Sequence, residues 1–553
     1  MFAFIKCRLA EKDDCSAPIT PFITTDIFAV SIIAFFVIIL GYYCMIPEVC
    51  GIFHDDGIYV INAKALATGQ GYRLINLPED PIQTKYPILY PAFLAIIWKL
   101  YPEFPQNVTI MKISTLIISA IATCIFYLYM VHFKYFQRYI AFSACLITSS
   151  LSISIFFSNN ILSEFPFAFL TLIALWSIDS LIIHDTSNKG HLFLVGFLSS
   201  LPFLCRTIGG VLLPLLFLLL LWRKRPVAWM TFGAAIIVVP WMLWCTFGNN
   251  SNNDNIMGFY TSYSSWWLHS TDINALWKII FYNLIFILMS VPQLSGIYDV
   301  FKYIFSTYYY IYLIPFGIMA FTIILYQSCQ IKIMPLFLLA YFAILCFWPW
   351  PPIRFLLPFA PYIISSLIFF MFQMNATIFK IHKLTYAIYL ILAAIIMFNL
   401  YTSQNIAAIS KKNNYPYGYM PKHQVSWSKY QELFEWINTN SNINDILGSG
   451  HDSVFYLYTS RNTLRPFAHY PLSMFYGADR PPIGTAEDLV SAIRKYNIKY
   501  LIHTPLPGFP EEKPFADLIS QVQQDCPGWL NPVFVGRDRR FIIFSVQGNQ
   551  GGL

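Results

Sequence analysis

Long apolar stretches recur along this chain and limit its fold more than any other feature. The hydrocarbon core of a bilayer is about 30 Å thick, so a helix needs ~20 apolar residues to cross it. By that criterion the sequence predicts about eleven membrane spans, within a range of about eleven to thirteen. The apolar stretches lie near residues 26–46, 108–131, 139–158, 161–183, 191–204, 207–222, 227–246, 304–326, 331–349, 355–373 and 384–402.

Three of the apolar segments raise questions of topology. Arg206 interrupts the short pair 191–204 and 207–222, so one long kinked helix is an alternative to two spans there. The stretch 276–292 is also apolar, and we expect it to be a membrane-surface or re-entrant segment. The first stretch begins too late and is too long for a cleavable signal peptide, so we expect it to be an anchor.

The composition agrees with a membrane protein and excludes other classes. Of the 553 residues, 57% are hydrophobic and only 11% are charged, whereas ordinary soluble domains have about 25% charged residues. This shortage of charge excludes a disordered chain and a soluble enzyme. The 35 Lys and Arg against 28 Asp and Glu leave a net charge of +7, too little for a nucleic-acid binder of this length. We therefore predict a polytopic α-helical membrane protein.

Basic residues in the short loops predict its orientation. Lys134 and Arg138, the run 223–225, and Lys332 all fall on one side of the membrane if 276–292 does not cross it. That side is then the cytoplasm, and the loops 47–107 and 247–303 face outward. We expect two domains, a transmembrane catalytic domain at 1–402 and an extracytoplasmic domain at 403–553. Sparse cysteine in the outer segments favours a bacterial inner membrane.

The tail changes character after about residue 402. SWSKYQELFEWINTN has apolar residues at helical spacing, and TAEDLVSAIRKYN begins with Thr485 and Asp488 at the spacing of a capping box. IKYLIHT is typical of a buried strand, and PVFVG with RFIIFSV is typical of a hairpin. The tail is therefore predicted to form a small α/β domain of roughly 130–150 residues.

Polar residues gather at the expected outer ends of the spans. A charged side chain at the bilayer centre costs about 2.5–3.5 kcal/mol, so each polar residue within or beside a span is a functional candidate. His54, Asp55 and Asp56 stand directly before a helical pattern. One carboxylate there is explained by helix capping. Capping explains two adjacent carboxylates beside a histidine less well, and this pattern favours a general base or a metal ligand.

Cationic residues recur at the same level. Lys85 directly precedes Tyr86, and Tyr90 follows four residues later, in a segment that two prolines hold out of regular helix. Arg206 and Arg354 lie beside apolar spans, where a guanidinium can grip a phosphate with two hydrogen bonds. Taken singly, each cation also fits an interfacial anchor.

Glu164 opens a later span on the same face, where it also fits an acid at a helix N-terminus. Together the acids and cations form a more specific pattern than any one of them. Cations at headgroup depth suit a lipid-linked phosphate, and carboxylates suit activation of an incoming hydroxyl. The pattern predicts transfer of a group from a lipid-phosphate donor.

These strings resemble the GT-C superfamily of membrane glycosyltransferases. The nearest branch contains protein O-mannosyltransferases, lipid A aminoarabinose transferase and bacterial lipopolysaccharide-core transferases. The family's acidic pair, aromatic, small residue and glycine are matched by Asp55, Asp56, Tyr59, Ala63 and Gly69. Its later elements are matched by Lys85, Pro87, Leu89, Tyr90 and Pro91, by Ser163 and Glu164, and by Arg354, Phe355, Leu356, Leu357 and Pro358.

The resemblance implies roles for these residues. Asp55 would be the general base, with Asp56 assisting it or binding the sugar or a metal. Lys85 would bind the carrier phosphate together with Arg354, and Arg206 is a further candidate for that work. Substrate-pocket candidates are His54, Tyr59, Tyr86, Tyr90 and Glu164. Thr84 stands where the aminoarabinose transferases carry an acid, and this departure argues against that sugar and against a metal held by that acid.

The sequence therefore predicts an inverting glycosyltransferase that uses a polyprenyl-phosphate-linked sugar at the outer face of the membrane. The acceptor would be a glycan, a lipid or a protein, and no cofactor beyond an optional divalent metal is expected. A lipid-linked oligosaccharide ligase or polymerase is the first alternative. A transporter or flippase is the alternative from another class, and it would place polar residues near the middle of the membrane in inverted repeats.

Overall fold

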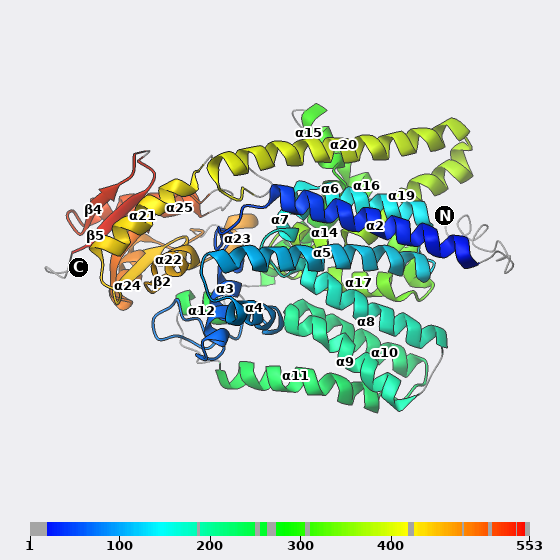
Figure 1. The fold of residues 1–553 in the computed structure, drawn as a ribbon, viewed down its shortest axis with the longest axis horizontal. Coiled ribbons are helices and arrows are strands. Elements are labelled where there is room, and N and C mark those ends of the chain that lie inside the picture. The colour runs from blue at the N-terminus through cyan, green and yellow to red at the C-terminus, as the bar shows by residue number, and fades with distance from the viewer. Residues whose placement is uncertain are drawn as a thin grey trace.

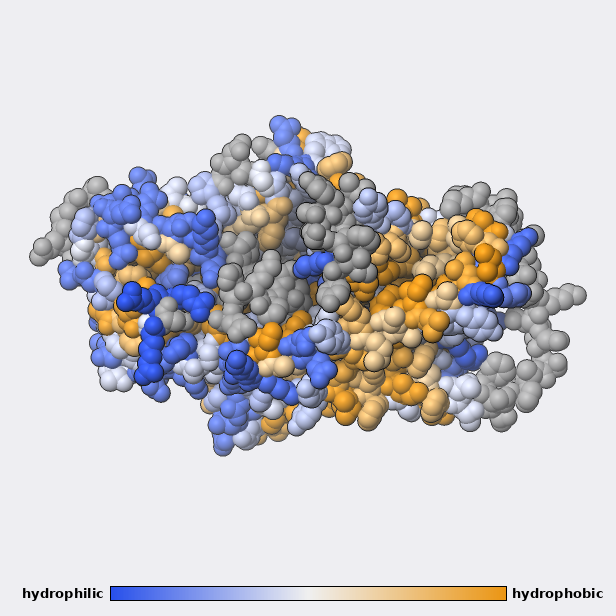
Figure 2. All heavy atoms as spheres, turned by 90° about the horizontal axis from the view of Figure 1, so that it is seen from above, coloured by the Kyte–Doolittle hydropathy of each residue, from blue (hydrophilic) through white to orange (hydrophobic). Residues whose placement is uncertain are grey.

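The structure, a computed structural model, describes residues 19–184, 188–248, 255–262, 273–304, 310–417, 425–477, 481–506, 511–537 and 539–547. Figure 1 shows a long helical bundle with a smaller region of helices and strands at one end. The first helix begins at the far end of the bundle from that region. On the face shown in Figure 2, apolar residues predominate over the bundle and hydrophilic residues predominate over the smaller region.

Long apolar helices make up most of the bundle, as predicted for a polytopic membrane protein. Among the described residues, eight helices are long and apolar enough to cross a membrane, or up to nine if one bent pair counts as a span. The eight are α2 (Ile19–Cys44), α5 (Gln106–His132), α8 (Glu164–His184), α11 (Ala228–Gly248), α14 (Ile273–Leu294), α16 (Tyr310–Cys329), the combined stretch of α18 (Ile353–Leu356) and α19 (Ala360–Met374), and α20 (His382–Asn413).

The remaining predicted spans are bent or short. The stretch 139–158 forms α6 (Arg138–Ser150) and α7 (Ser152–Ser158), which meet at an angle of 77°. The stretches 191–204, 207–222 and 331–349 form shorter helices, namely α9 (Lys189–Cys205), η1 (Thr207–Val211) with α10 (Leu212–Trp222), and α17 (Ile333–Cys346). The count of full-length spans is therefore lower than about eleven, because these segments fall short of ~20 residues.

The chain turns back at Arg206. A Cβ added to Gly209 would lie 2.5 Å from the backbone carbon of Pro202, whereas residues seven apart in a continuous helix are about 10 Å apart. Gly209 permits this close approach because it has no side chain. The alternative of one long kinked helix across 191–222 is therefore wrong.

The stretch 276–292 also differs from expectation. It lies within α14, an uninterrupted helix of 22 residues that packs against α16, α17 and α19. A re-entrant loop would break the helix, and no break is present between Ile273 and Leu294. The orientation argued from basic loops required that this segment not cross, so the side of the membrane stays a prediction. Lys134 does lie beside Lys332, because the Nζ of Lys332 donates a 3.0 Å hydrogen bond to the backbone carbonyl of Lys134.

The expected first outer loop folds into helices at the end of the bundle nearest the tail. These are α3 (Asp55–Ala67) and α4 (Leu89–Leu100), and the second loop adds α12 (Asn255–Thr261) and α15 (Ile297–Ile304). Helix α3 docks on α22 (Asp452–Thr459) of the tail so closely that a Cβ on Gly57 would lie 2.5 Å from the Ser453 side chain.

The tail contains a five-stranded sheet with the order β2-β1-β3-β5-β4. The strands are β1 (Ile446–Ser449), β2 (Thr463–Leu464), β3 (Ile498–His503), β4 (Leu530–Val535) and β5 (Ile542–Val546). The first three pair in parallel, and β5 pairs antiparallel with both β3 and β4. The helices around them are α21 (Trp427–Asn440), α22, α23 (Pro471–Phe475), α24 (Ala486–Lys495) and α25 (Glu512–Asp525).

The predicted tail elements are confirmed: helices α21 and α24, strand β3 and the β4–β5 hairpin. The capping box at the start of α24 is present, because Thr485 and Asp488 each accept a hydrogen bond from the other's backbone N–H. Strands β1 and β2 and helices α22, α23 and α25 were not predicted.

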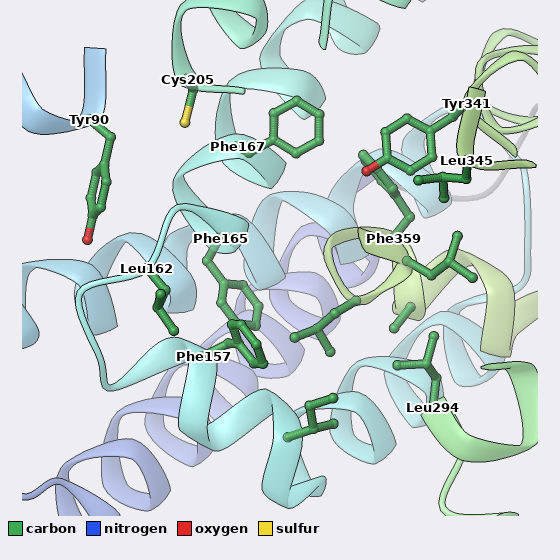
Figure 3. Packing of buried hydrophobic residues seen from close by; sticks show 14 of the residues in the cluster. Tyr90, Phe157, Leu162, Phe165, Phe167, Cys205, Leu294, Tyr341, Leu345 and Phe359 are labelled. Carbon is green, nitrogen blue, oxygen red and sulfur yellow. The ribbon is translucent and has the colours of Figure 1, made fainter. Parts of the chain in front are cut away.

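The membrane core packs aromatic and branched side chains from many helices. Figure 3 shows part of it, with Tyr90 of α4, Phe157 of α7, Phe165 of α8 and Tyr341 of α17. Tyr341 also donates a hydrogen bond of 2.9 Å to the carbonyl of Phe355. This packing holds together the ends of α7, α8, α17 and α18 where the polar candidates lie.

Candidate active site

The two adjacent aspartates at the start of α3 point to different partners. Successive residues of a helix project about 100° apart, so neighbours do not share a face. Asp55 accepts a 2.5 Å hydrogen bond from the hydroxyl of Tyr86 and pairs with Arg354 at 2.6 Å. Asp56 accepts from the backbone N–H groups of Gly51 and Phe53 at 2.7 and 3.0 Å. Asp56 therefore fixes the turn before α3, and Asp55 faces the other candidates.

A chain of ion pairs joins Asp55 to the start of α8. Arg354 reaches both Asp55 and Glu164, with its Nε 2.6 Å from a Glu164 oxygen. Arg206 donates to the same Glu164 oxygen at 2.5 Å and to Ser163 at 3.2 Å. Ser163 in turn shares a 2.7 Å hydrogen bond with Tyr59. Glu164 is fully buried, and its neutralisation by two arginines is what permits that.

Lys85 lies on the other side of Tyr86. Its Nζ donates to the carbonyl of Phe259 in α12 and sits 4.1 Å from the centre of the Phe259 ring. Burial lowers the pKa of Lys85 to about 7; the carboxylate of Asp55 acts in the opposite sense, and Arg465 adds to the lowering. Asp55, Lys85 and Arg354, which are far apart along the chain, thus meet at one site.

A second charged cluster lies on the Phe259 side and includes residues of the tail. Asp452, at the start of α22, is 3.1 Å from His54 and 3.2 Å from the Nε of Arg465. Tyr260 donates a 2.8 Å hydrogen bond to the other oxygen of Asp452. All four residues are buried. The cluster therefore ties the first outer loop and α12 to the tail.

This cluster continues beyond Arg465. The guanidinium of Arg465 is 3.1 Å from His469, which is itself 3.1 Å from Glu511. The ring of His469 stacks on Phe259 with centroids 4.0 Å apart. Burial lowers the pKa of His469 to about 4, so its ring is neutral at pH 7. One side of Phe259 thus faces the tail cluster, while its carbonyl binds Lys85.

The local charges set the protonation states of the two aspartates. Burial raises the pKa of Asp55, but Arg354, His54 and Tyr86 outweigh it and hold the pKa below its usual range. Burial raises the pKa of Asp56 to about 6, although the N–H of Gly51 and the ammonium of Lys112 lower it. Asp55 is therefore ionised at neutral pH, as a general base must be before it accepts a proton.

The donor set is a poor match for the optional divalent metal. Among the described residues, no group of three or more His, Cys, Asp or Glu side chains is placed to hold a metal ion. Both oxygens of Asp56 are taken by backbone N–H groups, and Glu164 is held by two arginines.

Most predicted site residues come together, and several others were missed. One set of predicted residues is connected by direct contacts: Asp55, Glu164, Arg206, Arg354, Tyr59 and Tyr86. Lys85 and His54 lie beside this set. Tyr90 lies below, where its ring contacts Tyr59 at 5.1 Å and its hydroxyl shares a hydrogen bond with Thr115. The missed residues are Tyr260, Asp452, Arg465, His469 and Glu511. The sequence carried a weak signal for them, namely HD at 451–452 and RPFAH at 465–469 in an otherwise apolar context.

Comparison with solved structures identifies the fold. The chain resembles the archaeal oligosaccharyltransferase AglB from Archaeoglobus fulgidus, solved with an inhibitory peptide and a dolichol-phosphate. The TM-score is 0.52 at 10% identity, over 94% of this chain and 74% of that one. The same enzyme with zinc and sulfate gives a TM-score of 0.54 at 12% identity, over 94% and 73%. ArnT from Cupriavidus metallidurans, bound to undecaprenyl phosphate, gives 0.47 at 10% identity, over 96% and 98%.

AglB is a GT-C superfamily membrane glycosyltransferase. The chain therefore has the GT-C fold, as its motifs predicted, and it is an integral membrane protein. No family model matches the sequence, and no curated protein matches it. The structural similarity establishes the fold. At identities this low the activity has to be argued from the site.

Proposed function

We propose that this protein is a membrane glycosyltransferase that moves a sugar from a polyprenyl-phosphate-linked donor to an acceptor at the outer face of the membrane. The fold supports the class, because AglB is an oligosaccharyltransferase and was solved with a dolichol-phosphate. The observation that carries the proposal is the contact between Asp55 and Arg354 at 2.6 Å, together with Tyr86, which donates to Asp55 and whose ring centre is 5.8 Å from the Nζ of Lys85. An ionised base and cations for a phosphate lie within one site.

The reaction would follow from the placement of these groups. An acceptor hydroxyl attacks the anomeric carbon as Asp55 takes its proton, and the bond from that carbon to the phosphate oxygen breaks. Lys85 and Arg354 stabilise the negative charge that grows on the leaving polyprenyl phosphate, with Arg206 held behind them by Glu164. A single displacement inverts the configuration of the sugar. Arg354 must shift its contact from Asp55 toward the phosphate when the donor binds.

A small apolar pocket lies close to these cations, between α14, α16, α17 and α19. Its lining includes Leu356, two residues after Arg354, together with Leu288 and Ile363. The tail of the donor would pack against apolar side chains such as these, close along the chain to Arg354. Apolar contacts of this kind contribute affinity for the donor. The rate of transfer must come from the charged groups, which bind the transition state more tightly than the donor.

Analysis of the reaction products tests this proposal. Purified full-length protein in nanodiscs is given polyprenyl-phosphate-linked monosaccharides and a lipid and glycan extract from cells that lack the chain. We expect acceptors heavier by one sugar and release of free polyprenyl phosphate. Transfer of an oligosaccharide would favour the ligase or polymerase. Movement of intact donor between leaflets with no new product would favour the transporter or flippase, and either result would overturn the proposal.

The protonation of Lys85 predicts a pH dependence for use of the donor. The pKa of Lys85 is about 7, so its ammonium is mostly charged at pH 6 and mostly neutral at pH 8. A phosphodiester donor keeps its single negative charge over that range. We expect kcat/KM for the donor to fall about tenfold from pH 6 to pH 8, since kcat/KM reports the free enzyme.

The variant Lys85→Arg separates this effect from other titrations. A guanidinium stays charged throughout, so the fall in kcat/KM between pH 6 and pH 8 should be much weaker in this variant. Lys332→Arg, at the opposite end of the bundle, is the matched control and should keep the fall. An unchanged pH profile in Lys85→Arg would assign the titration to another group.

A further inference from the structure

Lys85 and Tyr86 lie in a segment that has no regular secondary structure. Residues 83–88 form neither helix nor strand between α3 and α4, so their backbone N–H groups need partners from elsewhere. The side chain of Gln83 is a partner for both residues. Its Oε1 accepts hydrogen bonds from the backbone N–H of Lys85 at 2.9 Å and from that of Tyr86 at 3.2 Å. One amide oxygen therefore sets the course of the chain through both residues.

Gln83 is itself held in place. It is fully buried, and its backbone N–H donates to the carbonyl of Tyr72 at 3.0 Å. Its carbonyl accepts a 3.0 Å hydrogen bond from the indole N–H of Trp244 in α11. Tyr72 also donates from its hydroxyl to the carbonyl of Tyr86 at 2.8 Å. The backbone on both sides of Lys85 is thus fixed, and the Gln83 side chain connects the two sides.

The two backbone donors define which way the Gln83 amide points. Only the carbonyl oxygen of an amide can accept from an N–H group, so Oε1 faces Lys85 and Tyr86. The Nε2 group is buried and has no hydrogen-bond partner among the described residues. A buried donor without an acceptor is unfavourable. A glutamine at this position is therefore explained by the two hydrogen bonds to its oxygen.

The two residues held by Gln83 face different groups of the candidate active site. The Nζ of Lys85 donates to the carbonyl of Phe259, and the hydroxyl of Tyr86 donates to Asp55 at 2.5 Å. Lys85 is the proposed contact for the donor phosphate, and Asp55 is the proposed base for the acceptor. A misplacement of about 1 Å can lower a catalysed rate by about 10²-fold. The position of this short segment therefore bears on both reactants.

We propose that Gln83 is a positioning residue of this site, whose side-chain oxygen holds Lys85 toward the donor phosphate and Tyr86 against Asp55. Gln83 acts through these two residues. Its effect on sugar transfer rests on the proposed function, whereas its hold on residues 83–88 does not.

Hydrogen exchange of the full chain in nanodiscs, followed by mass spectrometry, tests the hold on the segment without turnover. Gln83→Met keeps the length of the side chain but removes the acceptor, so peptides that cover residues 84–88 should exchange about tenfold faster. Gln83→Glu keeps an oxygen in the same place, and two N–H donors favour its charged form. This variant should keep the slow exchange, because the Nε2 group that it loses has no partner among the described residues.

Kinetics connect the segment to the reaction. Gln83→Met should lower kcat/KM for the donor about tenfold at pH 6, and Gln83→Glu should restore it to within a few-fold. Burial is the main cause of the lowered pKa of Lys85, and Asp55 and Arg465 are the charged groups that act on it. A loosened segment exposes the ammonium to water and raises its pKa toward ~10.4. Lys85 then stays charged up to pH 8, so Gln83→Met should lose most of the fall in kcat/KM between pH 6 and pH 8.

Gln327→Met is the matched control, since Gln327 is also buried but lies beside Lys332 at the opposite end of the bundle. Its amide binds the Tyr135 carbonyl and the Tyr362 hydroxyl. This variant should leave the exchange of residues 84–88 and the pH profile unchanged.

Three results would overturn the proposal. They are unchanged exchange in Gln83→Met, losses in Gln83→Glu as large as in Gln83→Met, and the same kinetic losses in Gln327→Met. If Gln83→Met does not fold, Gln83→Glu decides alone, because rapid exchange of residues 84–88 in that variant would contradict the role of the oxygen. Slow exchange that depends on Gln83 in a protein that transfers no sugar would instead contradict the proposed function and leave the hold on the segment in place.

Discussion

Replacement of Asp55 by Asn is expected to lower the rate of sugar transfer by about 10²–10⁴-fold, the usual contribution of a general base. Asn has nearly the same shape and can still accept a hydrogen bond from Tyr86, but it cannot take the proton of the acceptor hydroxyl. Arg354 keeps its 2.6 Å contact with Glu164 in this variant. Donor binding should therefore stay within a few-fold of the unsubstituted protein. Single-turnover transfer and donor titration measure the two quantities separately.

Asp26→Asn is the matched control for this experiment. Asp26 also pairs with an arginine, Arg138, at 2.8 Å, but in the opposite part of the bundle from the tail. Loss of this partly exposed pair should change stability by no more than about 1 kcal/mol and leave transfer unchanged. Equal activity in Asp55→Asn and Asp26→Asn would remove Asp55 as the base. Loss of donor binding in Asp55→Asn would show that the aspartate holds Arg354 in place and does not act on the acceptor.

The second large effect is expected from Asp452→Asn, and it concerns stability. Asp452 is fully buried and contacts His54, Tyr260 and Arg465. Removal of its charge leaves the buried Arg465 without its nearest carboxylate. Breaking a buried ion pair on one side typically costs about 3–5 kcal/mol. We expect a strongly lowered temperature of unfolding and faster proteolysis of the tail, because this residue joins the tail to the first outer loop.

An exposed ion pair of the same tail provides the comparison. Asp445 pairs with Lys499 at 3.1 Å, and the lysine is 48% exposed. Asp445→Asn should therefore change stability by less than about 1 kcal/mol. Similar unfolding temperatures for Asp452→Asn and Asp445→Asn would mean that the buried cluster does not stabilise the contact between tail and bundle.

The tail shows how far local sequence signals reach. The capping box of α24 and the two apolar runs of the β4–β5 hairpin involve residues close together in the chain, and both elements were predicted. Strand β1 has four residues and β2 has two, so neither carries a readable pattern. Strand β1 forms because it pairs with β3, where Leu447 lies opposite Tyr500, and β2 forms because it pairs with β1, where Thr463 lies opposite Leu447.

The site shows the same division. The acids and cations were predicted as a group, because charged residues beside apolar spans are costly and stand out. The different partners of Asp55 and Asp56 were not predictable, since both positions have the same residue type. The backbone N–H groups of Gly51 and Phe53 bind the carboxylate of Asp56, whereas Arg354 pairs with that of Asp55.

The sequence by itself determined the membrane class, the main apolar helices and the set of polar residues at one end of the bundle. These properties follow from composition and periodicity, which are local. Only the tertiary structure decided that α14 is one continuous helix, that the chain turns back at Arg206, and that Asp452 and Arg465 of the tail lie against His54. Contacts between distant segments depend on the packing of whole helices, and no short stretch of sequence records that packing.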